Sequence, residues 1–175
     1  MTKIVKLEAA EARRNLSALA AILVDCVEGG ASVSFMLPFS QAEAESYFGT
    51  VIQGVEGGDR ILLGGFAGDV LVGTVQLLTR MPPNQPHRAE IAKLLVMRSH
   101  RGQGVASALM KAAEDCARAE RKTLLMLDTA TGSDAERLYS RLNWTRAVVI
   151  PGYAMLPDGR FCDTTFFWKA LTSVI

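Results

Sequence analysis

The chain has 175 residues, of which 49% are hydrophobic and 21% are charged, a composition typical of a soluble globular protein with a single domain over residues 1–175. Lys and Arg number 19 against 18 Asp and Glu, so the formal net charge is +1. That balance excludes a whole-chain attraction to nucleic acid or to an anionic membrane. The sequence has no apolar run of membrane-spanning length and no apolar signal-peptide core, which predicts a cytoplasmic protein.

The three cysteines, Cys26, Cys116 and Cys162, are far apart in the sequence and odd in number. With only two histidines in the chain they form no zinc-binding pattern, so we expect no metal site. We interpret each cysteine as a small core residue in a reducing compartment, with a reactive thiol as the less favoured alternative.

The first half of the chain predicts a strand, two helices and a β-hairpin. The segment "KIVKL" reads as a strand, and apolar residues at three- and four-residue spacing over 16–27 predict a helix that stops at Gly29-Gly30. The segment 31–39 is a loop or a short helical turn. Ser40 begins a second helix with a capping-box pattern, and residues 60–80 form a hairpin around a turn near Gly68-Asp69.

The second half predicts a parallel strand–helix–strand unit and a second hairpin. "RAEIAKLLVM" is a strand, a Gly-rich turn follows, and a helix continues to about Arg121. "KTLLMLDT" reads as a strand buried on both faces, and "SDAERLYSRLNW" as a short helix capped by Ser133 or Asp134. The order βααβββαβαββ, with its one parallel unit at 88–129, predicts an α+β fold around a central mixed sheet.

The Gly-rich turn between the strand and helix of this unit has the features of an anion site. Backbone N–H groups at a helix start lack internal partners and lie at the positive end of the helix dipole. Gly102 and Gly104 allow unusual dihedral angles and close approach of a phosphate, and Arg101 can add charge-assisted hydrogen bonds. The alternative is a surface turn without a ligand, in which the glycines serve the backbone geometry and the arginine serves solubility.

Two well-known phosphate motifs fit this turn poorly. A Walker loop needs Gly-Lys-Ser/Thr, which is absent. A Rossmann fingerprint is closer, because Gly102-x-Gly104-x-x-Ser107 follows a strand and Asp128 ends the next one. Its third position is Ser rather than Gly or Ala, and an antiparallel-looking hairpin precedes it, so a nucleotide-binding oxidoreductase is a weaker alternative.

A third motif accounts for Arg101 as well as the glycines. Arg101-x-x-Gly104-x-Ala106, directly after a strand, resembles the pyrophosphate-binding signature of the GNAT superfamily of acyl-CoA-dependent N-acetyltransferases. "SDAERLYSRLNW" resembles the second signature of that superfamily, in the right order and spacing. "EGGASVSFM", "RAEIAKLLV" and "PGYAMLPDGRFCDTTFFWKAL" narrow the similarity to acetyltransferases of the tabtoxin-resistance type. The resemblance implies a mostly antiparallel sheet, flanked by helices and splayed at an acetyl-CoA site.

The resemblance also implies which residues bind acetyl-CoA, and it implies no metal. The strand backbone before the turn would pair with pantetheine, and an N–H near Leu95 or Val96 would face the thioester oxygen. Many members carry Asn where this chain has Gly132, so Ser133 or the backbone would have to replace that contact. The expected cofactor-binding residues are Leu94, Leu95, Val96, Arg101, Gly102, Gln103, Gly104, Val105, Ala106, Ser107, Ser133 and Ala135.

Three side chains are candidates for proton transfer, because an amine attacks a thioester only when it is unprotonated. Tyr139 matches the family tyrosine that protonates the departing thiolate, although its position on an apolar helix face also fits a core aromatic residue. Glu90 is the first candidate for the general base, and could instead be a solvated partner of Arg88 or Lys93. Asp128 is the alternative base or an anchor for the amine.

The acceptor side is less clear from the sequence. Ser34 and Phe35 fall where the family's helical segment walls the acceptor cleft, and Tyr153 and Asp163 lie on the terminal hairpin. The acidic side chains Glu90, Asp128 and Asp163 suit a small cationic or zwitterionic amine such as an amino acid, a polyamine or a toxin. A peptide N-terminus as acceptor and a non-catalytic acyl-CoA-binding module remain alternatives, and a homodimer is expected by resemblance only.

Overall fold

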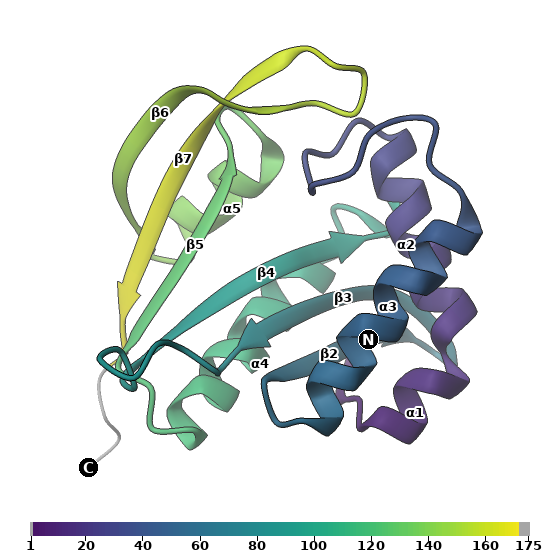
Figure 1. The fold of residues 1–175 in the computed structure, drawn as a ribbon, viewed down its shortest axis with the longest axis horizontal. Coiled ribbons are helices and arrows are strands. Elements are labelled where there is room, and N and C mark those ends of the chain that lie inside the picture. Colours follow the sequence, from purple (N-terminus) through teal and green to yellow (C-terminus); the bar gives the residue numbers. More distant parts are fainter. Residues whose placement is uncertain (1, 172–175) are drawn as a thin grey trace.

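The computed structural model describes residues 2–171 and is built on one seven-stranded sheet (Figure 1). The strand order is β1-β2-β3-β4-β5-β7-β6, and every neighbouring pair is antiparallel except β4 and β5. The strands are β1 (Thr2–Lys6), β2 (Arg60–Ala67), β3 (Val70–Leu78), β4 (Arg88–Val96), β5 (Leu124–Ala130), β6 (Thr145–Met155) and β7 (Phe161–Ala170). The predicted mixed, mostly antiparallel sheet is confirmed.

The helices begin and end close to the predicted positions. Ser40 forms the complete capping box with Glu43, and Ser133 rather than Asp134 caps the short helix. An additional helix precedes the first predicted one, separated from it by Asn15, whose backbone angles are φ −100° and ψ 11°. The helices are α1 (Ala9–Arg14), α2 (Leu16–Glu28), α3 (Gln41–Glu56), α4 (Val105–Ala119) and α5 (Asp134–Arg141), with a 3₁₀ turn η1 (Arg98–His100).

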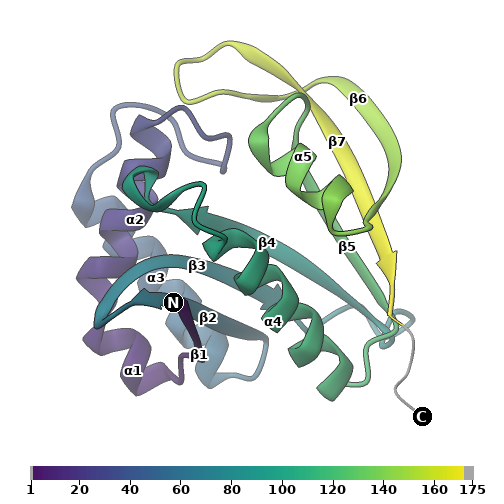
Figure 2. The same cartoon turned by 180° about the vertical axis from the view of Figure 1, so that it is seen from behind.

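Helices cover the two halves of the sheet unequally. In the half formed by β1 to β4, α1–α3 pack on one face and α4 packs on the other, so this half is buried on both sides (Figures 1 and 2). In the half formed by β5 to β7, α5 packs on the same face as α4, and no helix of the described chain covers the opposite face. The C-terminal half therefore presents one open sheet face.

The open face corrects one prediction about β5. The sequence predicts a strand buried on both faces, but only Leu125 and Leu127 are buried, on the side of α4 and α5. Met126 is half-buried and Asp128 is exposed on the other side. An apolar run looks the same in the sequence whether one face is covered or two, and here no helix covers the second face.

The parallel pair β4–β5 separates soon after it begins. Register pairs exist only at Arg88–Leu124, Ala89–Leu125 and Glu90–Met126. Beyond Glu90 the two strands diverge (Figure 1), while β4 shifts register against β3 near Lys93, whose φ is +51°. A residue inserted in this way is a β-bulge, which bends a strand and re-aims its side chains. The splay leaves the β4 backbone edge that faces β5 unpaired.

Two distant segments meet beyond the diverging strand ends. The loop between α2 and α3 reaches the turn between β6 and β7, where the Leu37 N–H donates to the Pro157 carbonyl at 2.9 Å. Ser32 Oγ donates to the Met155 carbonyl at 3.3 Å. These hydrogen bonds tie the N-terminal half of the molecule to the C-terminal half across the end of the splay.

Candidate active site

The Gly-rich turn joins the end of β4 to the start of α4. Gly102 and Gly104 have φ values of +74° and +82°, which residues with a Cβ atom adopt only with strain. A Cβ built at either position would meet no atom within 4 Å, so both glycines face open space. Glycine serves here to shape the backbone, and it leaves room for a ligand.

The amides of this turn form the clearest binding feature of the molecule. Within the described chain, the six consecutive backbone N–H groups of 102–107 donate to no protein acceptor. They surround the first turn of the 15-residue helix α4, where the helix dipole adds positive potential. The turn therefore offers the donors that an anion site needs, and this donor set fits a diphosphate.

Arg101 adds positive charge to the turn and also makes structural contacts that support it. Its Nε donates to the Val96 carbonyl at 3.3 Å, and one Nη lies 3.8 Å from Cys26 Sγ. The Cys26 thiol also donates to that carbonyl, at 3.5 Å, and burial raises its pKa, so the thiol stays protonated. The sequence indicated an anion ligand at Arg101 but gave no sign that Cys26 would contact it.

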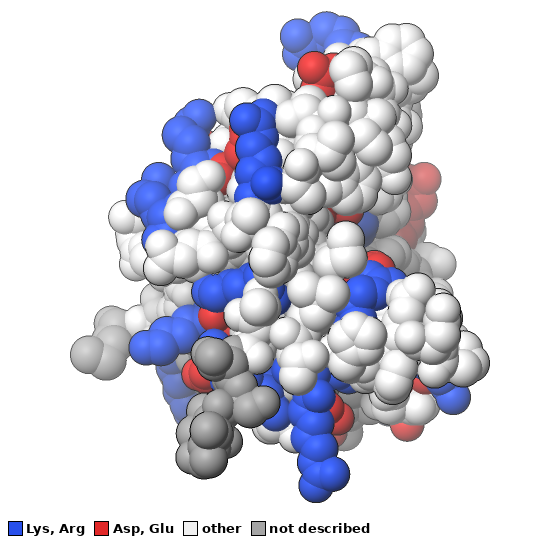
Figure 3. Space-filling view, turned by 90° about the vertical axis from the view of Figure 1, so that its left-hand side faces the viewer, with Lys and Arg blue, Asp and Glu red and all other residues white. Residues whose placement is uncertain are grey.

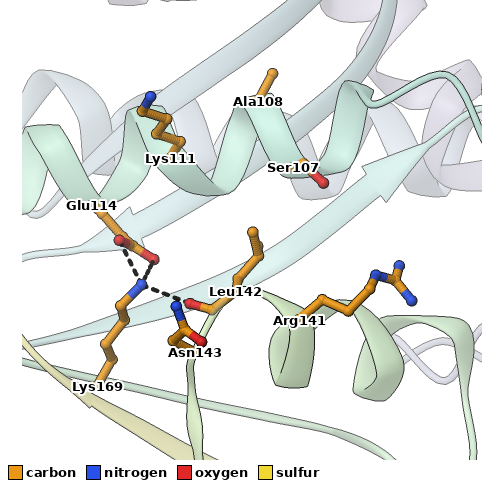
Figure 4. A pocket seen from close by; sticks show the side chains of 8 residues that line it. All are labelled: Ser107, Ala108, Lys111, Glu114, Arg141, Leu142, Asn143 and Lys169. Atoms are coloured by element: carbon orange, nitrogen blue, oxygen red, sulfur yellow. Dashed lines mark hydrogen bonds and ion pairs between the residues drawn. The ribbon is translucent and has the colours of Figure 1, made fainter.

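A cavity of about 440 Å³ lies between α4 and α5, with Ser107 of the first turn of α4 in its lining (Figure 4). Ser107 and Leu142 point into it, and an ion pair between Lys169 and Glu114 closes one end. Lys111 and Arg141 form no ion pair within the described residues, so they supply net positive charge near this space. The lining residues are Ser107, Ala108, Lys111, Glu114, Arg141, Leu142, Asn143 and Lys169. Apart from Ser107, the sequence reasoning missed them.

The backbone of β4 next to the turn is available for a ligand. The side chains of Leu94 and Val96 pack toward α4, while Leu95 packs in the opposite cluster with α2 and α3. Their side chains hold the core together, as expected for any sheet strand. The edge of the same residues that faces β5 has no partner strand, so an extended chain could pair with it.

Tyr139, on α5, lies in the core of the protein. The residue is 5% exposed, and its ring packs against Phe167 and Trp144 at centroid distances of 5.8 and 6.2 Å. The hydroxyl has no hydrogen-bond partner in the described chain, yet it is not fully buried. Burial and the charge of Asp128 raise the Tyr139 pKa far above its usual value, so the phenol keeps its proton at neutral pH.

Charged side chains gather where β4 and β5 separate. Glu90 forms an ion pair with Arg88, as in the alternative interpretation from the sequence. This pairing makes Glu90 a weaker candidate for the general base. Although Asp128 is exposed, partial desolvation raises its pKa; the cation of Lys93 opposes the rise and Glu90 adds to it. Desolvation lowers the pKa of Lys93, against the charge of Asp128. Of the two predicted bases, Asp128 has the environment of a proton acceptor.

The predicted acceptor residues divide into two groups. Ser34 lies beside this charged cluster, because its Oγ accepts a hydrogen bond from Lys93 Nζ at 3.0 Å. Tyr153 packs edge-on to Phe166 at 5.3 Å, and Phe166 is the cross-strand partner of Asp128, so Tyr153 shares the open face.

Phe35 and Asp163, and the predicted cofactor-binding residue Ser133, have structural roles in the fold. Phe35 packs against Phe39 and Tyr47 under α3. Asp163 accepts from the Gly152 amide at 2.9 Å and so supports an irregular part of β6. Ser133 accepts from the Glu136 amide at 3.1 Å as the N-cap of α5, next to Ala135, which packs on the core.

Within residues 2–171, no group of three or more His, Cys, Asp or Glu side chains is arranged to hold a metal ion. The same part of the chain contains no helix with the length and hydropathy required to cross a membrane.

Comparison with known proteins agrees with this geometry. The model of the acetyltransferase (GNAT) family matches residues 31–144, which is more than half of the chain. The match includes α3, the bulged strand β4, the Gly-rich turn and α5, and it ends at Trp144.

Solved structures show the same fold over nearly the whole chain. An N-acetyltransferase from Staphylococcus aureus Mu50 superposes with a TM-score of 0.81 at 20% identity, covering 98% of this chain and 99% of that one. The structure of yncA from Salmonella typhimurium, solved with its cofactor acetyl-CoA, gives 0.78 at 19% identity over 98% and 94%. A ribosomal-protein-alanine N-acetyltransferase from Brucella melitensis gives 0.80 at 20% over 97% and 99%.

Proposed function

Because this chain belongs to the acetyltransferase (GNAT) family, whose members use acetyl-CoA, we propose that it transfers the acetyl group directly to a primary amine of a small molecule. The observation that carries the proposal is the coincidence of two features at one place. Six unpartnered amides and an unpaired strand edge lie beside one another, where a diphosphate and an extended arm need them.

The donor site follows from these groups. The amides of 102–107 and the free N–H groups of Arg101 hold the pyrophosphate, and the β4 edge at Leu94–Val96 pairs with the pantetheine arm. The cavity beside Ser107, with Arg141 and Lys111 near it, receives the nucleotide end. An N–H of Leu95 or Val96 is the oxyanion donor, since it would face the thioester oxygen.

The chemical roles follow from the two shifted pKa values. The bond from carbonyl carbon to sulfur breaks as the bond from carbon to nitrogen forms, so one proton must leave the amine and one must reach the thiolate. Asp128, with its raised pKa, accepts the first proton directly or through water. Tyr139, protonated at neutral pH, donates the second.

A small acceptor is favoured by the contact at the end of the splay. The hydrogen bonds of Leu37 to Pro157 and of Ser32 to Met155 tie a loop to a hairpin turn there. We infer that this connection restricts access to the splay for a peptide chain more than for a small amine. The resemblance to enzymes of the tabtoxin-resistance type points to amino acids and amine-bearing toxins as the acceptors to test first.

The cytoplasmic location and the homodimer belong to the same proposal. Large apolar side chains are exposed on β6 and β7, and Figure 3 shows a broad uncharged area in the upper part of the molecule, where these strands lie. They include Val148, Tyr153, Phe161 and Trp168, at 51, 55, 70 and 39% exposure. A second copy could bury this surface, and sedimentation of the purified chain tests for it.

The direct test of the function is a coupled screen. Purified protein is mixed with acetyl-CoA and separate amino acids, polyamines, amine-bearing toxins and short peptides, with thiol release and product mass as readouts. Amine-dependent CoA release with an acetylated small molecule supports the proposal. If only peptide N-termini are acetylated, the proposed small-molecule acceptor is wrong and the protein is a peptide N-terminal acetyltransferase. Binding of acetyl-CoA without turnover of any amine would make the protein a non-catalytic acyl-CoA module.

A further inference from the structure

Lys93 and Asp128 carry opposite charges beside the splay, and neither has an ionic partner among residues 2–171. No described acid lies within ion-pair distance of Lys93, and no described base lies within that distance of Asp128. They are nevertheless close enough for each to shift the pKa of the other. Cation and anion thus face the same region without touching.

The other two charged side chains of this cluster, Arg88 and Glu90, neutralise each other. Arg88 Nη1 is bound to the carboxylate of Glu90, and Arg88 Nε donates to Gln85 at 2.8 Å. Glu90 therefore brings little uncompensated charge to the splay. A bound molecule meets one free anion, at Asp128, and one free cation, at Lys93.

The position of Lys93 is set by the bulge in β4 and by a contact from another segment. Its φ of +51° is uncommon for a residue with a Cβ atom, and so is the φ of +77° at Ser34. The two side chains meet in a hydrogen bond of 3.0 Å. This bond uses one of the three ammonium protons of Lys93, so two remain for a further acceptor.

We infer that the acceptor is an α-amino acid or a close analogue, with its ammonium at Asp128 and its carboxylate at Lys93. The inference rests on the proposed function, and it makes Lys93 a specificity-determining residue that the sequence did not single out. A zwitterion satisfies both free charges, while a polyamine would meet repulsion at Lys93 and a dicarboxylate without an amine would meet it at Asp128. Each contact would be a charge-assisted hydrogen bond.

The test compares acceptors that differ only in the carboxylate. Leucine and phenylalanine are each paired with their carboxamide and with the amine that lacks the carboxyl group. The ammonium pKa of the amide lies below that of the amino acid and that of the amine lies above it, so amine basicity cannot mimic the effect. Steady-state kcat/KM is measured for wild type, Lys93→Met, Lys93→Arg and Lys3→Met.

Lys3→Met is the matched control, because Lys3 is exposed on β1 at the far edge of the sheet. We expect Lys93→Met to lower kcat/KM by about 10- to 100-fold for the amino acids, the range of a hydrogen bond to a charged group, and by less than about threefold for amides and amines. Lys93→Arg should recover part of the loss. Acetyl-CoA affinity and the melting temperature, measured alongside, should be unchanged in all variants.

Three outcomes are distinguishable. Selective loss with the amino acids supports the inference. Equal turnover of carboxylate-free amines by wild type, or an equal loss for all acceptors in Lys93→Met, overturns it and leaves the proposed acetyltransferase function in place. If no acceptor of any kind is acetylated although acetyl-CoA binds, the proposed function fails, and the inference fails with it.

Discussion

The Gly-rich turn and the proposed acceptor side of the splay are assembled in different ways. The turn is one continuous segment, and its binding groups are backbone amides. The acceptor side combines side chains from three segments far apart in the chain, namely Ser34, Lys93 and Asp128, with Tyr153 on the same face. A site made of backbone depends on local conformation, whereas one made of side chains depends on how segments pack.

This difference implies that substitutions at one side should leave the other unaffected. The turn should control the affinity for acetyl-CoA, and the acceptor side should control the choice of amine. Tyr139, which lies in the core, should affect the rate without affecting either affinity.

The substitution Tyr139→Phe is expected to have the largest effect on activity. Loss of the general acid should lower kcat by about 100-fold, with little change in KM for either substrate. Stability should change little, since the hydroxyl has no hydrogen-bond partner in the described chain. The control is Tyr47→Phe, another largely buried tyrosine, whose hydroxyl accepts from Gln76 at 3.0 Å. It should cost about 1 kcal/mol of stability and leave kcat unchanged. A normal kcat in Tyr139→Phe would return Tyr139 to the core aromatic interpretation.

Next in size is Gly104→Val at the turn. A branched side chain at φ +82° strains the backbone and places a methyl group where the phosphate must approach, so the Kd for acetyl-CoA should rise by roughly 30-fold. Gly68→Val is the matched control, with φ +60°, equally open space and no proximity to the splay. Both should lose similar stability. Calorimetric titration of acetyl-CoA then separates backbone strain from ligand contact; an equal Kd in the two variants contradicts the phosphate site.

A smaller and opposite pair of effects is expected for Asp128→Asn. The folded-state pKa of Asp128 is raised, so its ionisation destabilises the fold; this cost builds up between the unfolded and the folded pKa and is fully present above the folded value. The amide should therefore raise the melting temperature at pH 7 by about 1 °C, a small value because the residue is exposed, and change nothing near pH 3. The acceptor KM should rise. A gain in stability without a loss of activity would show that Asp128 does not meet the amine.

The smallest effect concerns Ser133, which precedes the helix that carries Tyr139. Ser133→Ala and Ser40→Ala each remove an N-cap and should cost about 1 kcal/mol of unfolding free energy. If Ser133 also contacts the pantetheine arm in place of the family asparagine, only its variant should weaken acetyl-CoA binding, by about threefold. Chemical denaturation and acetyl-CoA titration of both variants measure the difference. Identical Kd values would reduce Ser133 to a helix cap.

Much of the fold was predictable because its signals are local. Ser40 and Glu43 predict the start of a helix, Gly29 predicts a helix end, and Gly68-Asp69 predicts a hairpin turn. Each of these features lies at the predicted position. The burial of β5 was not predictable in this way. Whether a helix covers the second face of a strand depends on the path of the chain elsewhere.

The sequence by itself determined the Gly-rich turn, the parallel unit around it, the mixed sheet and the family. These features follow from residues next to one another, since φ preferences, caps and periodic apolar positions act over a few residues. Only the tertiary structure decided that Arg88 neutralises Glu90, that Asp128 has the raised pKa, and that Lys93 meets Ser34. Charge and desolvation act through space, and residues 34, 93 and 128 become neighbours only after the sheet has formed.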